Sequence, residues 1–163
     1  MNNNLKPELL TDKSRLQEIY DLRVTAYENS PKSIYVNKQI FPIGWSDHLD
    51  NREQTYHFII QDNGKIVASS RLAVIDDLQE IKDLDEALEK FEIPQVRPFA
   101  YYSRLVVHHD YRKLGLVNSL DEVRINFLKQ QNNIHFAIAW ATPDRHEALL
   151  DFGFTHLGNF NYT

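Results

Sequence analysis

The stretch of residues 99–127 constrains the fold more than any other part of the sequence. Phe99–Val107 is rich in β-branched and aromatic residues, a composition typical of a buried strand. Beyond a short polar loop, apolar residues recur at the spacing of one helix face: Leu116, Leu120, Val123 and Phe127. A strand that runs directly into an amphipathic helix predicts a sheet against which helices pack.

A second strand and helix follow this pair. In residues 134–141 bulky side chains alternate with mostly small ones, so a helix can lie close to the small face and we expect a central strand. Thr142 and Pro143 suit the start of a helix, and Gly153 suits the left-handed residue after its last turn. Residues 154–163 are enough for one more strand, so a missing edge strand could come from the partner subunit of a homodimer.

The N-terminal region begins with a short predicted strand, residues 5–10, and a helix. Thr11 or Asp12 can cap this helix, and a proline lies just beyond its end. Residues 30–54 mix prolines and aromatics without clear periodicity, which predicts a loop with a short helix at residues 47–53.

A hairpin and an acidic helix are predicted in the middle of the chain. Residues 56–61 and 65–75 are β-rich, and Asn63 and Gly64 between them tolerate the positive φ angles of a tight turn. In residues 78–91 apolar side chains fall at three- and four-residue steps with acidic residues between them, which predicts an amphipathic helix.

In chain order these elements predict an α/β (α+β) protein with a mixed central sheet of six to seven strands and helices on both faces. The chain has 163 residues, of which 42% are hydrophobic, so it can build one core and we expect a single domain over residues 1–163. Residues 1–4 are expected to be disordered.

The composition excludes several classes of function. The formal charge of -5 and the lack of a Lys/Arg-rich run argue against nucleic acid as a partner. Without cysteine the chain has no disulfide, no thiolate metal site and no cysteine nucleophile. The N-terminus lacks a signal-peptide pattern, and no stretch approaches the ~20 apolar residues of a membrane span, so we expect a cytoplasmic protein with no membrane partner.

The loop after Phe99–Val107 carries residues suited to binding an anion. It contains Arg112, Lys113 and Gly115, and it opens a helix whose N–H groups and dipole can converge on a phosphate. The two cations add positive charge, and Gly115 lets the backbone approach the ligand without a Cβ in the way. These features predict a pyrophosphate site, and the alternative is an ordinary solvated loop.

On these residues the sequence resembles the GNAT (Gcn5-related N-acetyltransferase) superfamily, whose motif at this junction is Gln/Arg-x-x-Gly-x-Gly/Ala. Arg112 and Gly115 match, and Val117 occupies the last small position. Residues 148–154 are similar to the family's next motif, a helix that ends in Gly-Phe. The resemblance implies a GNAT fold and transfer of an acetyl or longer acyl group from coenzyme A to a primary amine of a small molecule, with acyl-CoA as co-substrate and no metal.

The same resemblance implies a cofactor site. In the family, the strand that matches residues 105–107 splays from its neighbour and pairs through its backbone with the pantetheine arm. We therefore expect the coenzyme to contact the strand end, the loop and the helix start: Leu105, Val106, Val107, Arg112, Lys113, Leu114, Gly115, Leu116 and Val117. Val117 departs from the family pattern, because its side chain adds bulk beside the expected pyrophosphate.

The catalytic groups are less constrained than the coenzyme site. An amine with a lysine-like pKa of ~10.4 must lose a proton to a base or a water chain before it attacks the thioester, and a backbone N–H of the strand could stabilise the oxyanion. The tyrosine that often acts as general acid in the family is Leu149 here, one helical turn after His146. The candidates are Tyr101, Tyr102, Ser103, His108 and His146.

Other interpretations of these residues are open. Tyr101 and Tyr102 point to opposite faces of a strand, so one of them belongs to the core. His108, His109 and Asp110 suggest a metal site, but adjacent residues of a strand point apart, so no metal is expected. From another class of function, the alternative is a sensor domain that binds acyl-CoA without turnover.

A second resemblance, to the acyl-homoserine lactone synthases, is partial. These GNAT-like enzymes share a scattered set with this chain: Arg23, Tyr27, Asp47, Asp50, Arg71, Ser103 and Arg104. The resemblance implies an autoinducer-synthase-like N-acyltransferase with a long-chain acyl donor, but Tyr101 stands where those enzymes have a carboxylate. The charged residues equally suit a buried ion network that holds the fold.

Overall fold

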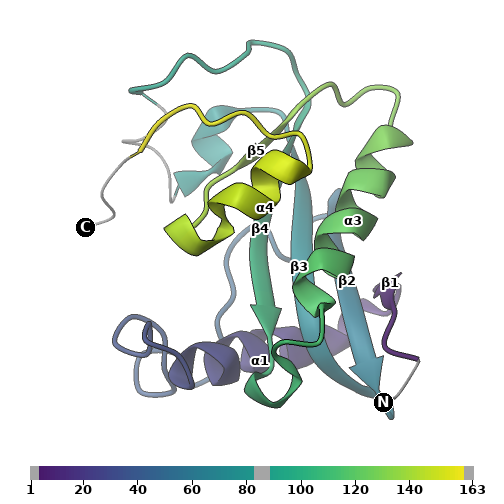
Figure 1. Ribbon diagram of the computed structural model, residues 1–163, viewed down its shortest axis with the longest axis vertical. Helices are drawn as coiled ribbons and strands as arrows, with labels where there is room; N and C mark the ends of the chain where they lie inside the picture. The colour runs from purple at the N-terminus through teal and green to yellow at the C-terminus, as the bar shows by residue number, and fades with distance from the viewer. Residues whose placement is uncertain (1–3, 83–88, 160–163) are drawn as a thin grey trace.

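The structure, a computed structural model, describes residues 4–82 and 89–159 (Figure 1). Within these ranges one sheet runs in the order β1-β2-β3-β4-β5, with strands β1 (Pro7–Leu9), β2 (Thr55–Asp62), β3 (Lys65–Ile75), β4 (Phe99–Val107) and β5 (Ala137–Ala139). Neighbouring strands are antiparallel except β4 and β5, which are parallel. The mixed sheet is confirmed, but the prediction of six to seven strands is wrong, because the described residues form five.

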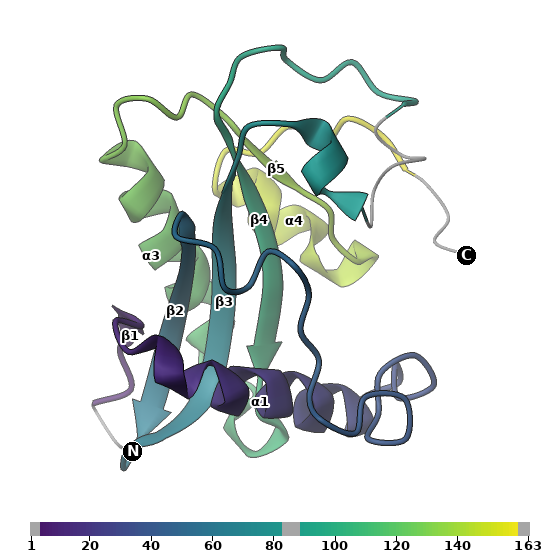
Figure 2. The same ribbon diagram turned by 180° about the vertical axis from the view of Figure 1, so that it is seen from behind.

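Helices cover both faces of this sheet, as predicted. α1 (Leu16–Glu28) crosses one face, whereas α3 (Leu116–Lys129) and α4 (His146–Asp151) lie on the other (Figures 1 and 2). Hydrophobic clusters pack on both faces, one around Ile19, Ile59 and Val106 under α1 and another around Phe58, Leu72 and Leu120 under α3. None of the helices in the two described ranges is long and apolar enough to cross a membrane.

Turns and helix ends follow the local sequence signals. Asn63 and Gly64 join β2 to β3 with φ angles of 50° and 80°, both positive as a tight hairpin turn requires. Asp12 accepts a backbone N–H of the 3₁₀ turn η1 (Lys13–Arg15), which leads into α1. Gly153 follows α4 with a φ of 94°, so the predicted left-handed glycine is confirmed.

Residues 47–53 consist of turns and irregular chain, so the short helix predicted there is wrong. The Asp47 side chain accepts the Leu49 N–H, and the Asp50 side chain accepts the Asp47 N–H. These side chains compete with the carbonyl groups that a helix would use as acceptors.

The predicted acidic helix at residues 78–91 is described only in part. Its beginning, η2 (Leu78–Glu80), is a 3₁₀ turn closed by a capping box between Asp77 and Glu80. Residues 83–88 lie outside the described residues, as do residues 1–3 of the N-terminal segment predicted to be disordered.

β5 is shorter than predicted and lies at the edge of the described sheet. The predicted alternation is present, because Ala137 and Ala139 pack on the α3 side while Ile138 packs on the opposite side. The η5 turn (Pro143–Arg145) follows soon after it. Residues 154–159 form no strand beside β5, so the prediction of a central strand is wrong within the described residues.

Candidate functional site

β4 loses one neighbour halfway along its length. It pairs with β5 only from Ala100 to Tyr102, whereas it stays paired with β3 as far as Val107. Within the described residues, positions 103–107 therefore have no partner strand on the β5 side. An extended chain can pair with such an edge through its backbone.

A β-bulge marks the start of this open edge. The register pairs Ser69 with Val106 and then Arg71 with Ser103, so β4 carries one extra residue between these pairs. Arg104 lies in that stretch with a φ of 54°. A left-handed backbone costs a non-glycine residue about 1–2 kcal/mol, and strain of this kind clusters at functional sites.

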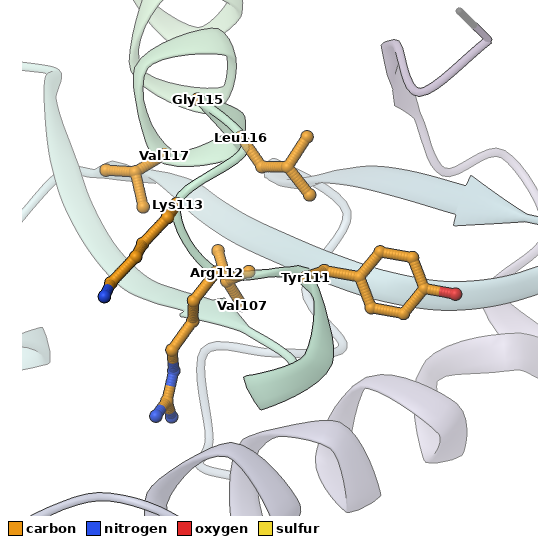
Figure 3. Close-up of a pocket in the computed structure, with 7 residues that line it drawn as sticks. All are labelled: Val107, Tyr111, Arg112, Lys113, Gly115, Leu116 and Val117. Atoms are coloured by element: carbon orange, nitrogen blue, oxygen red, sulfur yellow. The ribbon is translucent and has the colours of Figure 1, made fainter. Parts of the chain in front are cut away.

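A pocket of about 310 Å³ lies where β4 passes into α3 (Figure 3). The chain reaches it through η4 (His109–Tyr111), and Gly115 stands at the N-cap of α3. No side chain in the described part of the protein caps this helix, so its first N–H groups can bind an anion. The lining residues are Val107, Tyr111, Arg112, Lys113, Gly115, Leu116 and Val117.

The backbone at Gly115 leaves room for a ligand. Chain neighbours apart, a Cβ built at Gly115 would meet no protein atom within 4 Å, so packing inside the protein does not require the glycine. Its φ of 77° and its open surroundings instead fit a phosphate that approaches the backbone closely. A phosphate could therefore approach the backbone here, and a coenzyme diphosphate at this pocket stays a prediction.

Arg112 contacts α1 in this structure. Its guanidinium donates to the carbonyl oxygens of Ala26 and Asn29, each at 2.8 Å. A cation at this end of α1 offsets the negative end of the helix dipole, and Figure 3 shows the side chain directed towards that helix. Arg112 thus ties the loop to α1, and its contact with a phosphate stays a prediction. The neighbouring cation, Lys113, is exposed at the pocket.

The other predicted coenzyme residues differ in where their side chains lie. Leu116 and Val117 line the pocket, whereas Leu114 is 49% exposed. Leu105 packs against the α3-side core, and Val106 is buried on the α1 side. A coenzyme contact at residues 105 and 106 would therefore be made by the backbone, as the sequence predicts.

The two tyrosines of β4 point to opposite faces, as predicted. The Tyr102 hydroxyl donates to the backbone carbonyl of Asp121 at 2.9 Å, and burial raises the pKa of this phenol. Tyr101 is buried in the core of the other face beside Phe99 and Ala73. Because the Tyr102 hydroxyl is hydrogen-bonded to Asp121 in the core, we interpret Tyr102 as structural.

The other catalytic candidates on β4 and its flank differ in their contacts. The Ser103 hydroxyl lies beside the bulge and accepts the Arg71 Nε–H at 3.1 Å. His108 caps η4, where its Nδ1 accepts a backbone N–H at 3.2 Å, and burial lowers the pKa of its ring. Of the two, Ser103 is next to the bulge and His108 is at the far end of β4.

α4 has no acid at the position of the family's tyrosine. Leu149 packs against the α3-side core. His146 is exposed at the start of α4, and its ring lies edge-on to that of His156 with centroids 4.7 Å apart. A role for His146 in proton transfer stays a prediction.

His108, His109 and Asp110 lie closer together than predicted. They enter a 3₁₀ turn instead of continuing the strand, and the two imidazole rings stack with centroids 4.1 Å apart. One ligand atom from each residue lies within 4.8 Å of the others, so the premise that these side chains point apart is wrong. The expected absence of a metal stays a prediction.

The scattered charged residues of the sequence meet in one network. We call it the α1-side cluster, and it consists of Arg23, Asp47, Asp50, Arg71 and Arg104. Asp50 is 1% exposed and accepts from Arg23 and Arg71 at 2.8–2.9 Å. Asp47 accepts from Arg71 at 2.6 Å and from Arg104 at 2.8 Å. Burial opposes the ionisation of Asp47, but these two arginines outweigh it and hold its pKa well below its usual range.

A second buried network has no counterpart in the sequence prediction. This α3-side cluster consists of Tyr102, Asp121, Arg124 and Arg145. Asp121 is 0% exposed and accepts from Arg124 at 2.9 Å and from Arg145 at 2.6 Å. A signal for it exists in the sequence, because two opposite charges three residues apart stand among the apolar positions of a helix.

Known proteins share this fold and this arrangement of the chain. Residues 16–154 match the model of the acetyltransferase (GNAT) family. An aminoglycoside acetyltransferase from an uncultured soil metagenomic sample superposes with a TM-score of 0.61 at 19% identity over 99% of this chain and 97% of that one. A Trypanosoma brucei acetyltransferase gives 0.61 at 17% identity over 96% of each chain.

A third structure is that of an aminoglycoside N-acetyltransferase in complex with CoA, which gives a TM-score of 0.61 at 11% identity over 97% of each chain. No curated protein sequence matches significantly. Because the family model spans most of the chain, this protein belongs to the GNAT family of acetyltransferases.

Proposed function

We propose that this protein is an N-acyltransferase that moves an acetyl or longer acyl group from coenzyme A to a primary amine of a small molecule. The observation that carries the proposal is that the open β4 edge at residues 103–107 leads directly into the pocket at Gly115. An extended pantetheine arm suits the edge, and a diphosphate suits the start of a helix. Acyl-CoA supplies the activated thioester.

In this proposal the chain itself binds the donor and stabilises developing charge. The first N–H groups of α3 and the ammonium of Lys113 hold the diphosphate. Backbone groups of residues 105–107 pair with the pantetheine arm. One of their N–H groups stabilises the thioester oxygen on which negative charge develops during attack.

The amine must lose a proton before it attacks. Asp47 is 18% exposed, but Arg71 and Arg104 hold its pKa low, so its carboxylate is too weak a base. We therefore propose that the ammonium loses its proton to a base in bulk solvent, hydroxide or buffer, through water that reaches the open edge of β4. The Ser103 hydroxyl, which accepts the Arg71 Nε–H, stands at the start of this edge.

The acceptor is proposed to bind where the loop after α1 meets the bulge. The rings of Tyr27 and Trp45 are edge-to-face there with centroids 5.3 Å apart, and the Arg104 guanidinium covers the Trp45 ring at 4.3 Å. These groups form a wall next to the residues that hold the donor. Structural relatives that act on aminoglycosides make small polyamines the first class of acceptor to test.

Thiol release tests this function. Purified protein is mixed with acetyl-CoA or longer acyl-CoAs and a panel of small primary amines, and free coenzyme A is measured. Saturable release that depends on the amine supports an acyltransferase. Calorimetric binding of acyl-CoA with no release from any amine supports the sensor instead, an alternative that Val117 in the pocket and Leu149 in the core favour.

A second candidate is an autoinducer-synthase-like N-acyltransferase with a long-chain donor. It is supported by the convergence of Arg23, Asp47 and Arg104 in the α1-side cluster. Against it, Tyr101 is buried at the position of the missing carboxylate. Faster turnover with acylated acyl carrier protein than with acyl-CoA would favour this candidate.

We also propose that residues 1–163 act as a single domain and that the chain forms a homodimer. β5 is an edge strand within the described residues, and an edge strand can pair with that of a second copy. Light scattering measures the mass directly, and a monomer at micromolar concentration would contradict the dimer.

A further inference from the structure

Arg124 is a buried arginine whose guanidinium donates most of its hydrogen bonds to backbone carbonyls. It lies on α3, is 1% exposed, and donates through Nη1 to the carbonyl oxygens of Arg71 at 3.2 Å and Ser103 at 3.3 Å. Its Nε donates to the Leu120 carbonyl at 3.3 Å, and its Nη2 donates to Asp121 at 2.9 Å. Burying a guanidinium is unfavourable unless such partners are present.

The two strand carbonyls that Arg124 binds belong to the bulge. Arg71 and Ser103 form the register pair that adjoins the extra residue of β4, one residue from Arg104. A bulge interrupts the ladder and leaves backbone groups without strand partners. One guanidinium nitrogen that donates to a carbonyl on each strand therefore holds β3 and β4 together where the ladder is interrupted.

The same residues are also held from the opposite face of the sheet. The Arg71 side chain extends to the α1 side, where its Nε donates to the Ser103 hydroxyl at 3.1 Å and its Nη1 donates to Asp50 at 2.9 Å. Ser103 is thus bound through its hydroxyl on one face and through its carbonyl on the other. Arg71 therefore holds the bulge from the α1 side of the sheet and Arg124 holds it from the α3 side.

We infer that Arg124 is a positioning residue for acyl transfer: from the far side of the sheet it fixes the β4 bulge, and with it the open edge that receives the thioester. This inference rests on the proposed function. Arg124 itself lies in the core, too buried to reach a bound reactant. Removal of its guanidinium would let the edge relax, and displacements of about 1 Å at a reacting centre lower rates by roughly 100-fold.

Arg145 is a matched control within the chain. It donates to the other carboxylate oxygen of Asp121 at 2.6 Å, so R145M removes one positive charge from the same network as R124M. Its described contact is with Asp121 and not with the bulge carbonyls. A purely structural role predicts that the loss of activity in each variant follows its loss of folded protein, whereas a positioning role predicts a loss of kcat in R124M beyond its loss of folded protein.

The test compares acyl-CoA and amine kinetics of R124M, R124K and R145M, with the folded fraction of each measured by circular dichroism. We expect kcat of R124M to fall by about 30–100-fold with KM for acyl-CoA within about three-fold, because the pocket at Gly115 is untouched. The kcat of R124K should lie between those of R124M and the wild type. The kcat of R145M should stay within about three-fold of the wild-type value. Equal kcat losses in R124M and R145M, or losses that only follow the folded fraction, would overturn the inference.

Amide hydrogen exchange separates a failure of this inference from a failure of the proposed function. If the wild type releases no thiol with any amine, the proposed function fails, and exchange at residues 104–107 still tests Arg124. In R124K these amides should exchange at least about ten-fold faster than in R145M. If R124M does not fold, R124K provides both measurements. Equal exchange in R124K and R145M would contradict a role for Arg124 in holding the bulge.

Discussion

The two buried clusters lie on opposite faces of the same bulge, yet they differ in how completely their polar groups are paired. In the α3-side cluster, Asp121 accepts from three donors, and the guanidinium nitrogens of Arg124 all donate. In the α1-side cluster, Arg23 Nε and Arg71 Nη2 are buried and find no hydrogen-bond partner among the described residues. That cluster also has three arginines for two aspartates.

The difference indicates that the clusters on the two faces of the sheet have different roles, the α3-side cluster in holding β4 and the α1-side cluster beside the proposed acceptor site. In the α3-side cluster every guanidinium nitrogen of the buried Arg124 already donates inside the protein, so Arg124 can hold β4. The α1-side cluster reaches the surface at Asp47 and Arg104, which are 18% and 14% exposed, and it borders the proposed acceptor site. Three experiments test this difference between the two clusters.

The largest effect is expected from Asp50→Ala. The substitution leaves the buried Arg23 and Arg71 without their shared carboxylate, which should lower the free energy of unfolding by about 3–5 kcal/mol. Asp121→Ala should cost less, because the buried Arg124 keeps its three backbone carbonyl partners and Arg145, which is 19% exposed, can turn to water. Urea unfolding measures both, with Glu18→Ala in an exposed pair as a control expected to cost under about 1 kcal/mol. A larger loss of unfolding free energy in D121A than in D50A would contradict these different roles of the two clusters.

A pH effect should separate the α1 side from the α3 side. His57 is 3% exposed beside Asp50, and burial together with the nearby Arg23 lowers its pKa from 6.5 to about 4. Because only the unfolded chain binds this proton between these values, stability should fall by up to about 3 kcal/mol as the pH drops from 6.5 to 4.

The variant His57→Gln tests this expectation. It removes the titrating ring, so its unfolding free energy should depend less on pH between 6.5 and 4 than that of the wild type. Paired aspartates with lowered pKa values, such as Asp47, destabilise the fold only at lower pH. An unchanged pH slope in the variant would show that His57 does not link stability to pH.

The smallest effect is expected from Tyr102→Phe. The substitution removes a buried hydroxyl that donates to Asp121 and should lower stability by about 1 kcal/mol. Since we interpret the ring as structural, kcat should stay within about two-fold of the wild type. A loss of kcat above about ten-fold at unchanged stability would instead make Tyr102 catalytic.

Local chemistry explains which parts of the fold could be predicted from the sequence. The turn at Asn63 and Gly64, the glycine after α4 and the entry into α3 depend on residues adjacent in the chain. The pocket lies at the predicted loop for the same reason, because a strand, a glycine and a helix follow one another directly.

Contacts between distant segments could not be predicted in this way. Arg112 binds α1 carbonyls some 80 residues earlier in the chain, a partner that no local motif specifies. The bulge at Arg104 depends on the register between β3 and β4, and the role of Arg124 depends in turn on that bulge. The resemblance named the members of the α1-side cluster, but their pairing required the fold.

The most direct test of the coenzyme site compares two glycines. Gly115 and Gly64 have φ angles of 77° and 80°, and a Cβ added at either meets no atom within 4 Å, so G115A and G64A carry a similar backbone penalty. Only Gly115 lies at the pocket. In calorimetric titrations with acetyl-CoA, we predict that G64A binds like the wild type and that G115A binds at least about ten-fold more weakly. Equal affinity in all three proteins, or no binding by the wild type, would contradict a coenzyme site at the start of α3.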